Sequence, residues 1–393
     1  MDTARDSNGI TGDGPLNPAS GDYDISEQMN RAEKHKYVKV ETQLHVSCLN
    51  DQRSTGKKLG EGTYANVYLG HLRDSPTSLV AIKKIKIQKE YTEGLAPDAI
   101  RELKHLRELT HPNIISLLSV FTSKVQNLNL VLEYLPLGDL EMLIKDTDNI
   151  RYGAADIKAW MNMLVRAVWF CHDNFVLHRD IKPNNLLIAA DGEVKLADFG
   201  LARSFSDPYR QMTSNVITLW YRPPELLFGA KHYSGAVDIW SVGLVFAELI
   251  IRVPYLAGET EVMQIKIISQ AIGTPTEDNW PGVTKLPGYT VSEILPVQPK
   301  DTYLAMFGTA GEEGVNLLIQ MLVLDPNKRI TARQALEHGW WRADPKPTPK
   351  SELPKKTTDN KKNNIDLNLR QRLSDEDERE TKVARKLDFS STK

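Results

Sequence analysis

The pattern of apolar and polar positions changes character part-way along the chain. In the first part, short runs in which apolar and polar residues alternate predict twisted β-strands. These runs cover 67–69, 79–85, 114–120 and 128–134. One stretch among them, 95–109, has apolar residues at helical spacing with charges between them, and it predicts an amphipathic helix.

From residue 136 onward, helical spacing dominates. The expected helices cover 157–172, 236–251, 262–271, 315–322 and 331–338. The pattern therefore predicts an α+β fold with two lobes. A small β-rich N-lobe is expected at 54–135, and a larger helical C-lobe at 136–342.

Both ends of the chain differ from this middle part. Residues 1–48 are polar, rich in Gly, Asp and Asn, and weakly patterned, so we expect a disordered N-terminal tail. At 345–393 the chain is rich in Pro, Lys, Asn and Asp, and we expect a mobile, charged C-terminal tail.

Composition narrows the class of protein. The chain has 41% hydrophobic and 25% charged residues, which is typical of soluble globular proteins, and its net charge of −2 argues against a chain devoted to nucleic acid. The two cysteines, Cys48 and Cys171, lack the spacing of a zinc site. The longest apolar run, 239–251, is too short for a membrane span and predicts a buried helix, and no secretory signal peptide is expected at the start.

A glycine-rich stretch precedes the second expected strand. It reads Gly60-Glu61-Gly62-Thr63-Tyr64-Ala65-Asn66-Val67. Backbone N–H groups in such a turn can approach phosphate oxygens closely. Since a strand and not a helix follows, a hairpin over a nucleotide is favoured over a dinucleotide-binding turn, although a simple hairpin turn also fits these residues alone.

A strand lysine follows in Val80-Ala81-Ile82-Lys83. Most strand lysines are solvated, but Lys83 lies in an apolar stretch where an unpaired ammonium group would be costly. Glu102, on the expected helix, is the candidate partner of Lys83.

The most specific signal lies in three further motifs. They are His178-Arg179-Asp180-Ile181-Lys182-Pro183-Asn184-Asn185, then Asp198-Phe199-Gly200, then Pro224-Glu225. Phosphoryl transfer needs a group that accepts the proton of the substrate hydroxyl, and Asp180 is suited to that role. Asn185 and Asp198 offer the hard oxygen ligands that Mg²⁺ prefers. Lys182 would add positive charge near the transferred phosphoryl group, as expected for a serine/threonine kinase.

With these motifs the chain resembles the cyclin-dependent protein kinases over about 54–341. The resemblance also includes 95–102, which is similar to the family's cyclin-binding helix, 218–222, which is similar to its substrate-binding loop, and the insert that opens at Gly273-Thr274-Pro275-Thr276. The mitogen-activated kinases share the insert but carry Thr-x-Tyr where this chain has Thr213-Ser214-Asn215.

Within the cyclin-dependent family, the chain is most similar to the TFIIH-associated, CDK-activating kinase subtype. Two features carry that similarity: Ala65 in place of a third glycine, and the run 225–233. Three features depart from the expected pattern. Leu219 stands where an arginine is usual, Pro223 replaces an alanine, and Leu137-Gly138 lengthens the hinge by about one residue.

The resemblance implies a eukaryotic protein kinase fold and a set of site residues. ATP would contact Leu59, residues 60–67, Ala81, Lys83, Glu133, Leu135 and Leu187, with Leu132 as gatekeeper. An activating phosphate on Thr213 would be held by Arg101, Arg179 and Arg203, and Ile217 and Arg222 match the positions that select proline after the target residue. Glu225 is expected to pair with Arg329.

Taken together, these features predict an ATP- and Mg²⁺-dependent serine/threonine protein kinase that is cyclin-dependent and proline-directed. The resemblance implies a nuclear enzyme with a cyclin of the cyclin H type, the assembly factor of the TFIIH kinase module, and protein substrates, without direct nucleic-acid or membrane binding. Expected substrates are the C-terminal repeats of RNA polymerase II and the activation segments of other kinases. The alternative is a pseudokinase scaffold, which is disfavoured because Lys83, Asp180 and Asp198 are all present.

Overall fold

The computed structural model describes residues 37–39, 58–61, 65–72, 75–86, 97–123, 127–205, 207, 211–291 and 293–356. The chain divides into two compact units. The first unit takes residues 1–96 and 117–134, and the second takes 97–116 and 135–393. The predicted α+β organisation, with a β-rich part followed by a helical part, is confirmed.

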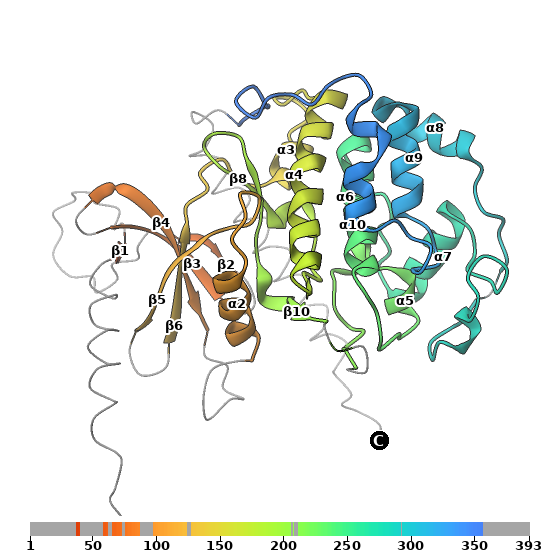
Figure 1. Ribbon diagram of the computed structural model, residues 1–393, viewed down its shortest axis with the longest axis horizontal. Coiled ribbons are helices and arrows are strands. Elements are labelled where there is room, and N and C mark those ends of the chain that lie inside the picture. The colour runs from red at the N-terminus through yellow and green to blue at the C-terminus, as the bar shows by residue number, and fades with distance from the viewer. Residues whose placement is uncertain are drawn as a thin grey trace, which may run out of the picture. The chain divides into compact units, whose positions relative to one another are not determined.

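The first unit is built on a six-stranded antiparallel sheet (Figure 1). Its strands are β1 (Tyr37–Lys39), β2 (Lys58–Glu61), β3 (Ala65–Leu72), β4 (Ser75–Ile85), β5 (Leu117–Ser123) and β6 (Asn127–Glu133). The order is β1-β3-β4-β6-β5, and β2 also pairs with β3.

Strand β4 lies at the centre of this sheet and alternates its side chains between the two faces. Val80 and Ile82 join Phe121 and Val131 in a buried cluster on one face. Because the period is two, Ala81 and Lys83 point to the other face.

Strand β1 lies in the part of the chain for which we expected no regular structure, 1–48. Tyr37, Val38 and Lys39 pair with Leu72, His71 and Gly70 of β3. Three residues of backbone pairing leave no clear hydrophobic pattern in a sequence, which explains why this strand was not predicted. The rest of 1–48 lies outside the described residues.

The second unit contains the described helices and four short strands. The helices are α2 (Pro97–Glu108), α3 (Leu140–Lys145), α4 (Ala154–Asp173), α5 (Pro224–Leu227), α6 (Ala236–Ile251), α7 (Glu261–Ala271), α8 (Lys300–Phe307), α9 (Gly311–Met321) and α10 (Ala332–Glu337). The strands are β7 (Val176–Leu177), β8 (Leu186–Ile188), β9 (Val194–Leu196) and β10 (Arg203–Ser204). Short 3₁₀ turns cover 183–185, 199–201, 219–221, 283–285, 308–310 and 339–341.

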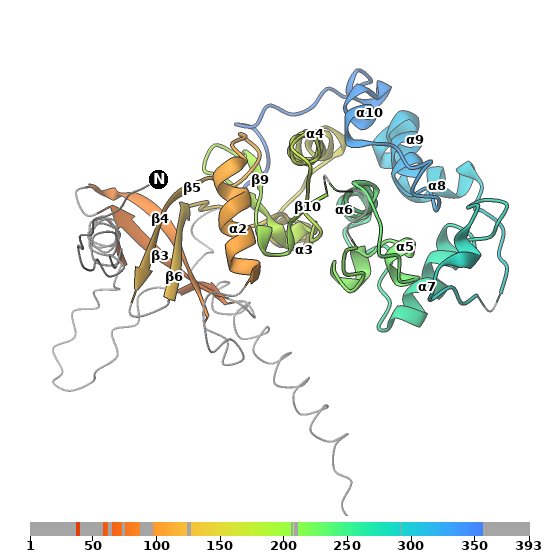
Figure 2. The same ribbon diagram turned by 60° about the horizontal axis from the view of Figure 1, so that its bottom comes forward.

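Helix α6 forms the centre of the second unit. Every residue from Val237 to Leu249 is buried, because α4 and α9 pack against this apolar helix (Figure 1, Figure 2). This confirms the buried helix expected at 239–251. Within the described residues, no helix is long and apolar enough to cross a membrane.

Local signals in the sequence set several helix ends. The Asp139 side chain accepts a hydrogen bond from the Met142 N–H at the start of α3, and Thr260 caps α7 in the same way. Thr331 and Gln334 form a reciprocal capping box at the start of α10.

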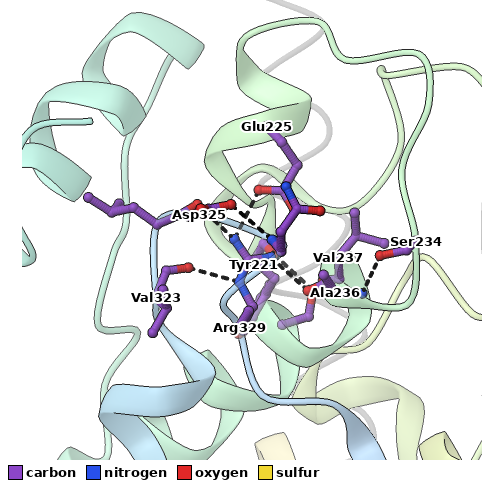
Figure 3. A network of polar contacts seen from close by, with 11 residues as sticks. Tyr221, Glu225, Ser234, Ala236, Val237, Val323, Asp325 and Arg329 are labelled. Carbon is purple, nitrogen blue, oxygen red and sulfur yellow. Dashed lines mark hydrogen bonds and ion pairs between the residues drawn. The ribbon is translucent and has the colours of Figure 1, made fainter. Parts of the chain in front are cut away.

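The buried ion pair expected between Glu225 and Arg329 is confirmed (Figure 3). The guanidinium group meets the carboxylate with two parallel bonds, Nη1 to Oε1 at 2.8 Å and Nη2 to Oε2 at 3.0 Å. Its remaining donors reach the carbonyl oxygens of Ala236 at 2.7 Å and Val323 at 2.9 Å. Because both charges are buried, these additional bonds are needed to offset desolvation. The pair ties α5 to the segment before α10.

We expected a mobile tail from residue 345 onward, but the first part of this segment is packed on the second unit. Residues 345–356 run back across the ends of α4 and α3 and pack there (Figure 1). Leu353 is buried in this segment, with 3% of its surface exposed. Residues 357–393 lie outside the described residues.

Candidate active site

A compact polar cluster forms where the loop after β7 meets the segment before α5. The Asn185 amide donates to the backbone carbonyl of Asp180 at 2.7 Å and to its Oδ2 at 3.0 Å. Lys182 Nζ lies 3.0 Å from the same Oδ2 and donates to Thr218 Oγ1 at 2.9 Å. The Thr218 hydroxyl donates to Asp180 Oδ1 at 3.0 Å. The structure thus brings together Asp180, Lys182 and Asn185, as the motif predicts.

A fully buried carboxylate, that of Asp238, holds the backbone of the loop that carries Asp180. Asp238, in the first turn of α6, accepts the backbone N–H of His178 and of Arg179, each at 2.9 Å, and contacts His172 Nε2 at 2.9 Å. Burial acts to raise the pKa of Asp238, but the hydrogen bond and charge of His172 and the hydrogen bond from the Arg179 N–H together lower it. Asp238 therefore stays ionised and fixes the backbone that carries Asp180.

The rest of the loop is anchored by His178. Its Nε2 lies 3.1 Å from the Ala197 carbonyl oxygen, and its ring meets Phe199 edge-on with centroids 4.7 Å apart. Full burial lowers the pKa of His178, so the ring is neutral at physiological pH. Asp180 and the Asp198-Phe199-Gly200 turn are thereby held against one packed imidazole.

Three residues other than glycine adopt left-handed backbone conformations in this region. They are Arg179 with φ of 63°, Asp198 with φ of 63° and Ile217 with φ of 67°. Such conformations are costly for side chains with a Cβ and tend to occur where function requires them. For the β-branched Ile217 the cost is largest, which marks this turn as a constrained element of the site.

The donor set at Asn185 and Asp198 fits a magnesium ion. Both Asn185 amide hydrogens face Asp180, so its Oδ1 is the atom left for a cation. The Ala197 N–H, next to Asp198, donates to the Asn185 carbonyl at 2.9 Å and keeps the two segments adjacent. Among the described residues, no three His, Cys, Asp or Glu side chains gather as metal ligands. Mg²⁺ binds through one or two protein oxygens together with phosphates and water, and Asn185 and Asp198 are residues of the required type.

The Ile217 carbonyl oxygen is occupied by an arginine. Arg222 donates to it from Nε at 3.2 Å and from Nη2 at 3.1 Å, while its Nη1 lies 2.5 Å from Glu261 of α7. The side chain of Arg222 is buried by these contacts. The Ile217 carbonyl oxygen is therefore already hydrogen-bonded within the chain.

The exposed Thr213 lies close to one of the three expected phosphate-binding arginines. Arg179 donates to the Tyr233 hydroxyl at 2.9 Å, and that hydroxyl donates to the Thr213 carbonyl at 2.8 Å. Burial raises the pKa of Tyr233, and the charges of Arg179 and Arg203 act to lower it, so both cations lie near this ring.

Arg101, the second of the expected phosphate-binding arginines, lies on α2 one turn before His105. Burial lowers the pKa of His105 on α2, and the charges of Arg101 and Arg179 add to that effect. In the described structure Arg101 is paired with Asp98. The three arginines come from different segments of the second unit, and their joint binding of a phosphate stays a prediction.

The expected nucleotide-binding residues divide between the two units. In the first unit, Val67 pairs with Lys83 across β3 and β4, and Ala81 pairs with Leu132 on β6. Leu135 and Leu187 belong to the second unit, as does Glu102, whose side chain is buried. The tip of the glycine-rich turn, Gly62-Thr63-Tyr64, lies outside the described residues. ATP contacts and the pairing of Lys83 with Glu102 stay predictions.

Comparison with known proteins identifies the family to which this chain belongs. The model of the protein kinase domain matches residues 53–341. The chain belongs to the protein kinase family. This kinase is 49% identical over 305 residues to the serine/threonine-protein kinase KIN28 of Saccharomyces cerevisiae, an alignment that covers 78% of this chain and 98% of the relative.

Two further comparisons define the class of this kinase. It is 42% identical over 353 residues to cyclin-dependent kinase 7 of Xenopus laevis, covering 86% of this chain and 97% of the relative. It also matches a chain in the structure of the CAK complex from Chaetomium thermophilum bound to ATP-γ-S, with 70% identity, a TM-score of 0.78, and coverage of 84% and 99% of the two chains. The kinase is an ATP-using serine/threonine-protein kinase of the KIN28 and cyclin-dependent kinase 7 type, as the sequence motifs predicted.

Sequence reasoning missed two residues that shape the site of this kinase. Asp238 organises the catalytic loop, and Tyr233 links Arg179 to the Thr213 backbone. The first had a signal, because a carboxylate near the start of an otherwise apolar helix needs a buried partner. The second had none, since the contact joins residues 54 positions apart.

Proposed function

We propose that this kinase, bound to a cyclin, transfers the γ-phosphoryl group of ATP to serine or threonine residues followed by proline. The observation that supports the proposal is the cluster of Asp180, Lys182, Asn185 and Thr218. Asp238 fixes this cluster by accepting the backbone N–H of Arg179, next to Asp180. Phosphoryl transfer depends mainly on positioning and on stabilisation of charge, and this cluster supplies both.

In the proposed reaction, Asp180 orients the substrate hydroxyl and accepts its proton. The substrate oxygen then bonds to the γ-phosphorus while the bond to the β–γ bridging oxygen breaks, which leaves ADP. The hydrogen bond from Thr218 to Asp180 Oδ1 supports this role, because it indicates that the carboxylate can accept a threonine hydroxyl. Lys182, 3.0 Å from Asp180, would add positive charge beside the transferred group.

Asn185 and Asp198 are the residues that would hold magnesium. When bound, the ion would neutralise charge on the ATP phosphates. Lys83, paired with Glu102, would hold the α- and β-phosphates, and the strand residues around the glycine-rich turn would cover the nucleotide.

The contact between Arg222 and Ile217 supports proline selection. A substrate residue after the target that carries an N–H would lose its hydration next to a carbonyl that Arg222 already occupies. Proline has no N–H and avoids that cost. In the proposed complex, the left-handed conformation of Ile217 would help its carbonyl to reach Arg222.

The partner would be a cyclin, of the cyclin H type, together with the assembly factor of the TFIIH kinase module. Similarity to a chain of a CAK complex supports a multisubunit assembly. A phosphate on Thr213 would bring Arg101, Arg179 and Arg203 together and so order the segment that carries Thr218. We infer that the kinase acts in the nucleus on RNA polymerase II C-terminal repeats and on activation segments of other cyclin-dependent kinases.

The test begins with the kinase complex purified from its own cells, whose subunits are identified by mass spectrometry. We expect a cyclin among them, and phosphate transfer to a peptide of Ser–Pro repeats. The free chain should be at least about a hundredfold less active than the complex, since the cyclin would shift an unfavourable conformational equilibrium. Full activity from a demonstrably monomeric preparation would contradict cyclin dependence.

A further inference from the structure

The segment 345–356 is fastened to the second unit by specific contacts. At its start, Lys158 of α4, 1% exposed, donates to the carbonyl oxygens of Ala343 at 2.8 Å and Pro345 at 2.7 Å. Further along, Lys350 contacts Asp191 at 2.6 Å and Glu193 at 2.7 Å, and Lys356 lies 3.3 Å from Asp146. We call residues 345–356 the strap.

One glycine indicates that the strap has a defined seat. Gly192 has a φ of 93°, and a Cβ placed there would lie 2.0 Å from the Lys350 carbonyl oxygen. A side chain at this position would therefore collide with the strap backbone. The surface between β8 and β9 is shaped to receive this segment.

Thr348 makes the contact that joins the strap to the start of α4. Its N–H donates to the Ala155 carbonyl at 3.1 Å, and its hydroxyl donates to Asp156 Oδ1 at 2.8 Å. The other carboxylate oxygen, Oδ2, accepts the Gly153 N–H at 2.9 Å. Asp156 therefore already fills the place at this helix N-terminus that favours an anion.

Thr348 also precedes Pro349, and the residues on both sides of it are exposed. Segments without regular structure and with exposed flanks open locally at low cost, which a kinase needs in order to bind them. Thr274 also precedes a proline, but it is fully buried. Within the described side chains, Thr348 is thus the accessible threonine with this motif.

We propose that Thr348 is a phosphorylation site for proline-directed serine/threonine kinases, and that a phosphate there releases the strap. The Thr348 oxygen bonds to the γ-phosphorus of ATP, the bond to the β–γ bridging oxygen breaks, ADP leaves, and the hydroxyl proton is released. Where the phosphorylating enzyme is a second copy of this kinase, the proposal rests on the proline-directed activity proposed above.

Two changes at Asp156 follow from that modification. The phosphate removes the hydrogen that Thr348 donates to Asp156, and it places close to two negative charges beside a carboxylate. Nearby cations already have partners: Lys346, two residues before Thr348, donates to the Arg342 carbonyl oxygen and lies 3.6 Å from Asp344. Lys350 is engaged by Asp191 and Glu193, and Lys158 by two carbonyl oxygens. Repulsion from Asp156 therefore drives the strap away from α4.

The experiment uses the full chain in its cyclin complex. An Asp180→Asn complex, which serves only as acceptor, is incubated with ATP and either wild-type complex or a mitogen-activated kinase, and Thr348 phosphate is measured by peptide mass spectrometry. A Ser–Pro peptide in the same tube reports the activity of each enzyme. We expect phosphate on Thr348 in at least one of the two incubations. The Thr348→Ser variant should carry the phosphate on the serine at position 348, and the Thr348→Ala variant should carry no phosphate at that position.

Release is then measured by hydrogen exchange of the Thr348 and Glu352 amides, both of which donate hydrogen bonds in the docked strap. Phosphorylation should speed their exchange at least tenfold. In Asp156→Asn the neutral amide can donate to the phosphate, so the acceleration should shrink to less than threefold. Gly192→Ala should speed exchange without any phosphate.

The outcomes separate the two proposals. Phosphate on Thr348 from the mitogen-activated kinase alone, with the Ser–Pro peptide untouched by the wild-type complex, would support the site and contradict the proline-directed activity. If neither enzyme modifies Thr348, or if modified protein exchanges at the unmodified rate, the proposed site is overturned.

Discussion

At the scale of single residues, Glu248 couples the stability of this kinase to pH. Its carboxylate lies in α6, 3% exposed, and accepts the Tyr221 hydroxyl at 2.6 Å. Burial raises the pKa of Glu248 to about 7 from an ordinary value of 4.5, which outweighs the opposing effect of the hydrogen bond from Tyr221. Between pH 4.5 and pH 7, therefore, Glu248 is protonated in the folded protein but ionised in the unfolded chain.

Stability should accordingly fall as pH rises from 4.5 to 7, by up to about 3 kcal/mol. We expect Glu248→Gln to remove this contribution to the slope, as measured by thermal midpoints from pH 5 to 8. Tyr221→Phe, which removes the hydrogen bond to Glu248, should instead extend the slope to higher pH. An unchanged pH dependence in Glu248→Gln would show that this carboxyl group is ionised when folded.

Asp238 offers a second prediction at the residue scale. In Asp238→Asn, an NH₂ group replaces one acceptor oxygen, so a backbone N–H of His178 or Arg179 loses its partner. We expect a loss of about 1–3 kcal/mol in stability, and at least a tenfold fall in kcat with little change in the KM for ATP. Asp148→Asn, on an exposed turn, is the matched control. Equal kcat values for the two variants would mean that Asp238 does not position the catalytic loop.

The same residues indicate what the sequence can predict about a site. Asp180, Lys182 and Asn185 are close in the chain, so their motif nearly determines their geometry. Thr218 and Asp238 reach the cluster across the fold, 38 and 59 positions from Asp180 and Arg179 respectively. Such contacts depend on packing, and no local pattern encodes them.

At the scale of elements, the pair of Glu225 and Arg329 links α5 to the segment before α10 (Figure 3). Arg329→Met should leave a buried, unpaired carboxylate and cost about 3–5 kcal/mol, and Glu225→Gln should also destabilise strongly. The double variant should lose less free energy of unfolding than the two single variants together, because it leaves no buried charge without a partner. Thermal midpoints of the four proteins give this comparison, and strictly additive losses would argue against direct coupling.

Elements with strong periodicity were predicted well, and several short elements were not. The helix expected at 236–251 has those bounds in the structure, because α6 is a long run of mostly apolar residues, interrupted by Asp238, Ser241 and Glu248. The helices α3 and α8, of six and eight residues, were not predicted, whereas α10, which also has six residues, lies within the helix expected at 331–338. Strand β5 begins at Leu117, three residues after the expected start, because Ile114 pairs in isolation with Leu196.

At the scale of the whole molecule, the sequence predicted two parts of different character, and the structure has them. What it could not predict was the course of 345–356. Lysines and prolines there indicate a solvated tail, yet Lys350 and Lys356 find carboxylates on the second unit and Leu353 is buried. The charge pattern of one segment does not reveal that a complementary surface exists elsewhere.

We propose that the complete kinase, with Asp180 as proton acceptor, phosphorylates residues followed by proline. The most direct test is the kcat/KM of the cyclin complex on matched Ser–Pro and Ser–Ala peptides, for wild type and Asp180→Asn, with ATP binding measured in parallel. We expect wild type to favour Ser–Pro by at least about tenfold, and Asp180→Asn to lose at least about a thousandfold in kcat while still binding ATP. Near-normal turnover by Asp180→Asn would contradict the role of Asp180 as proton acceptor, and equal rates on the two peptides would contradict the proline-directed activity.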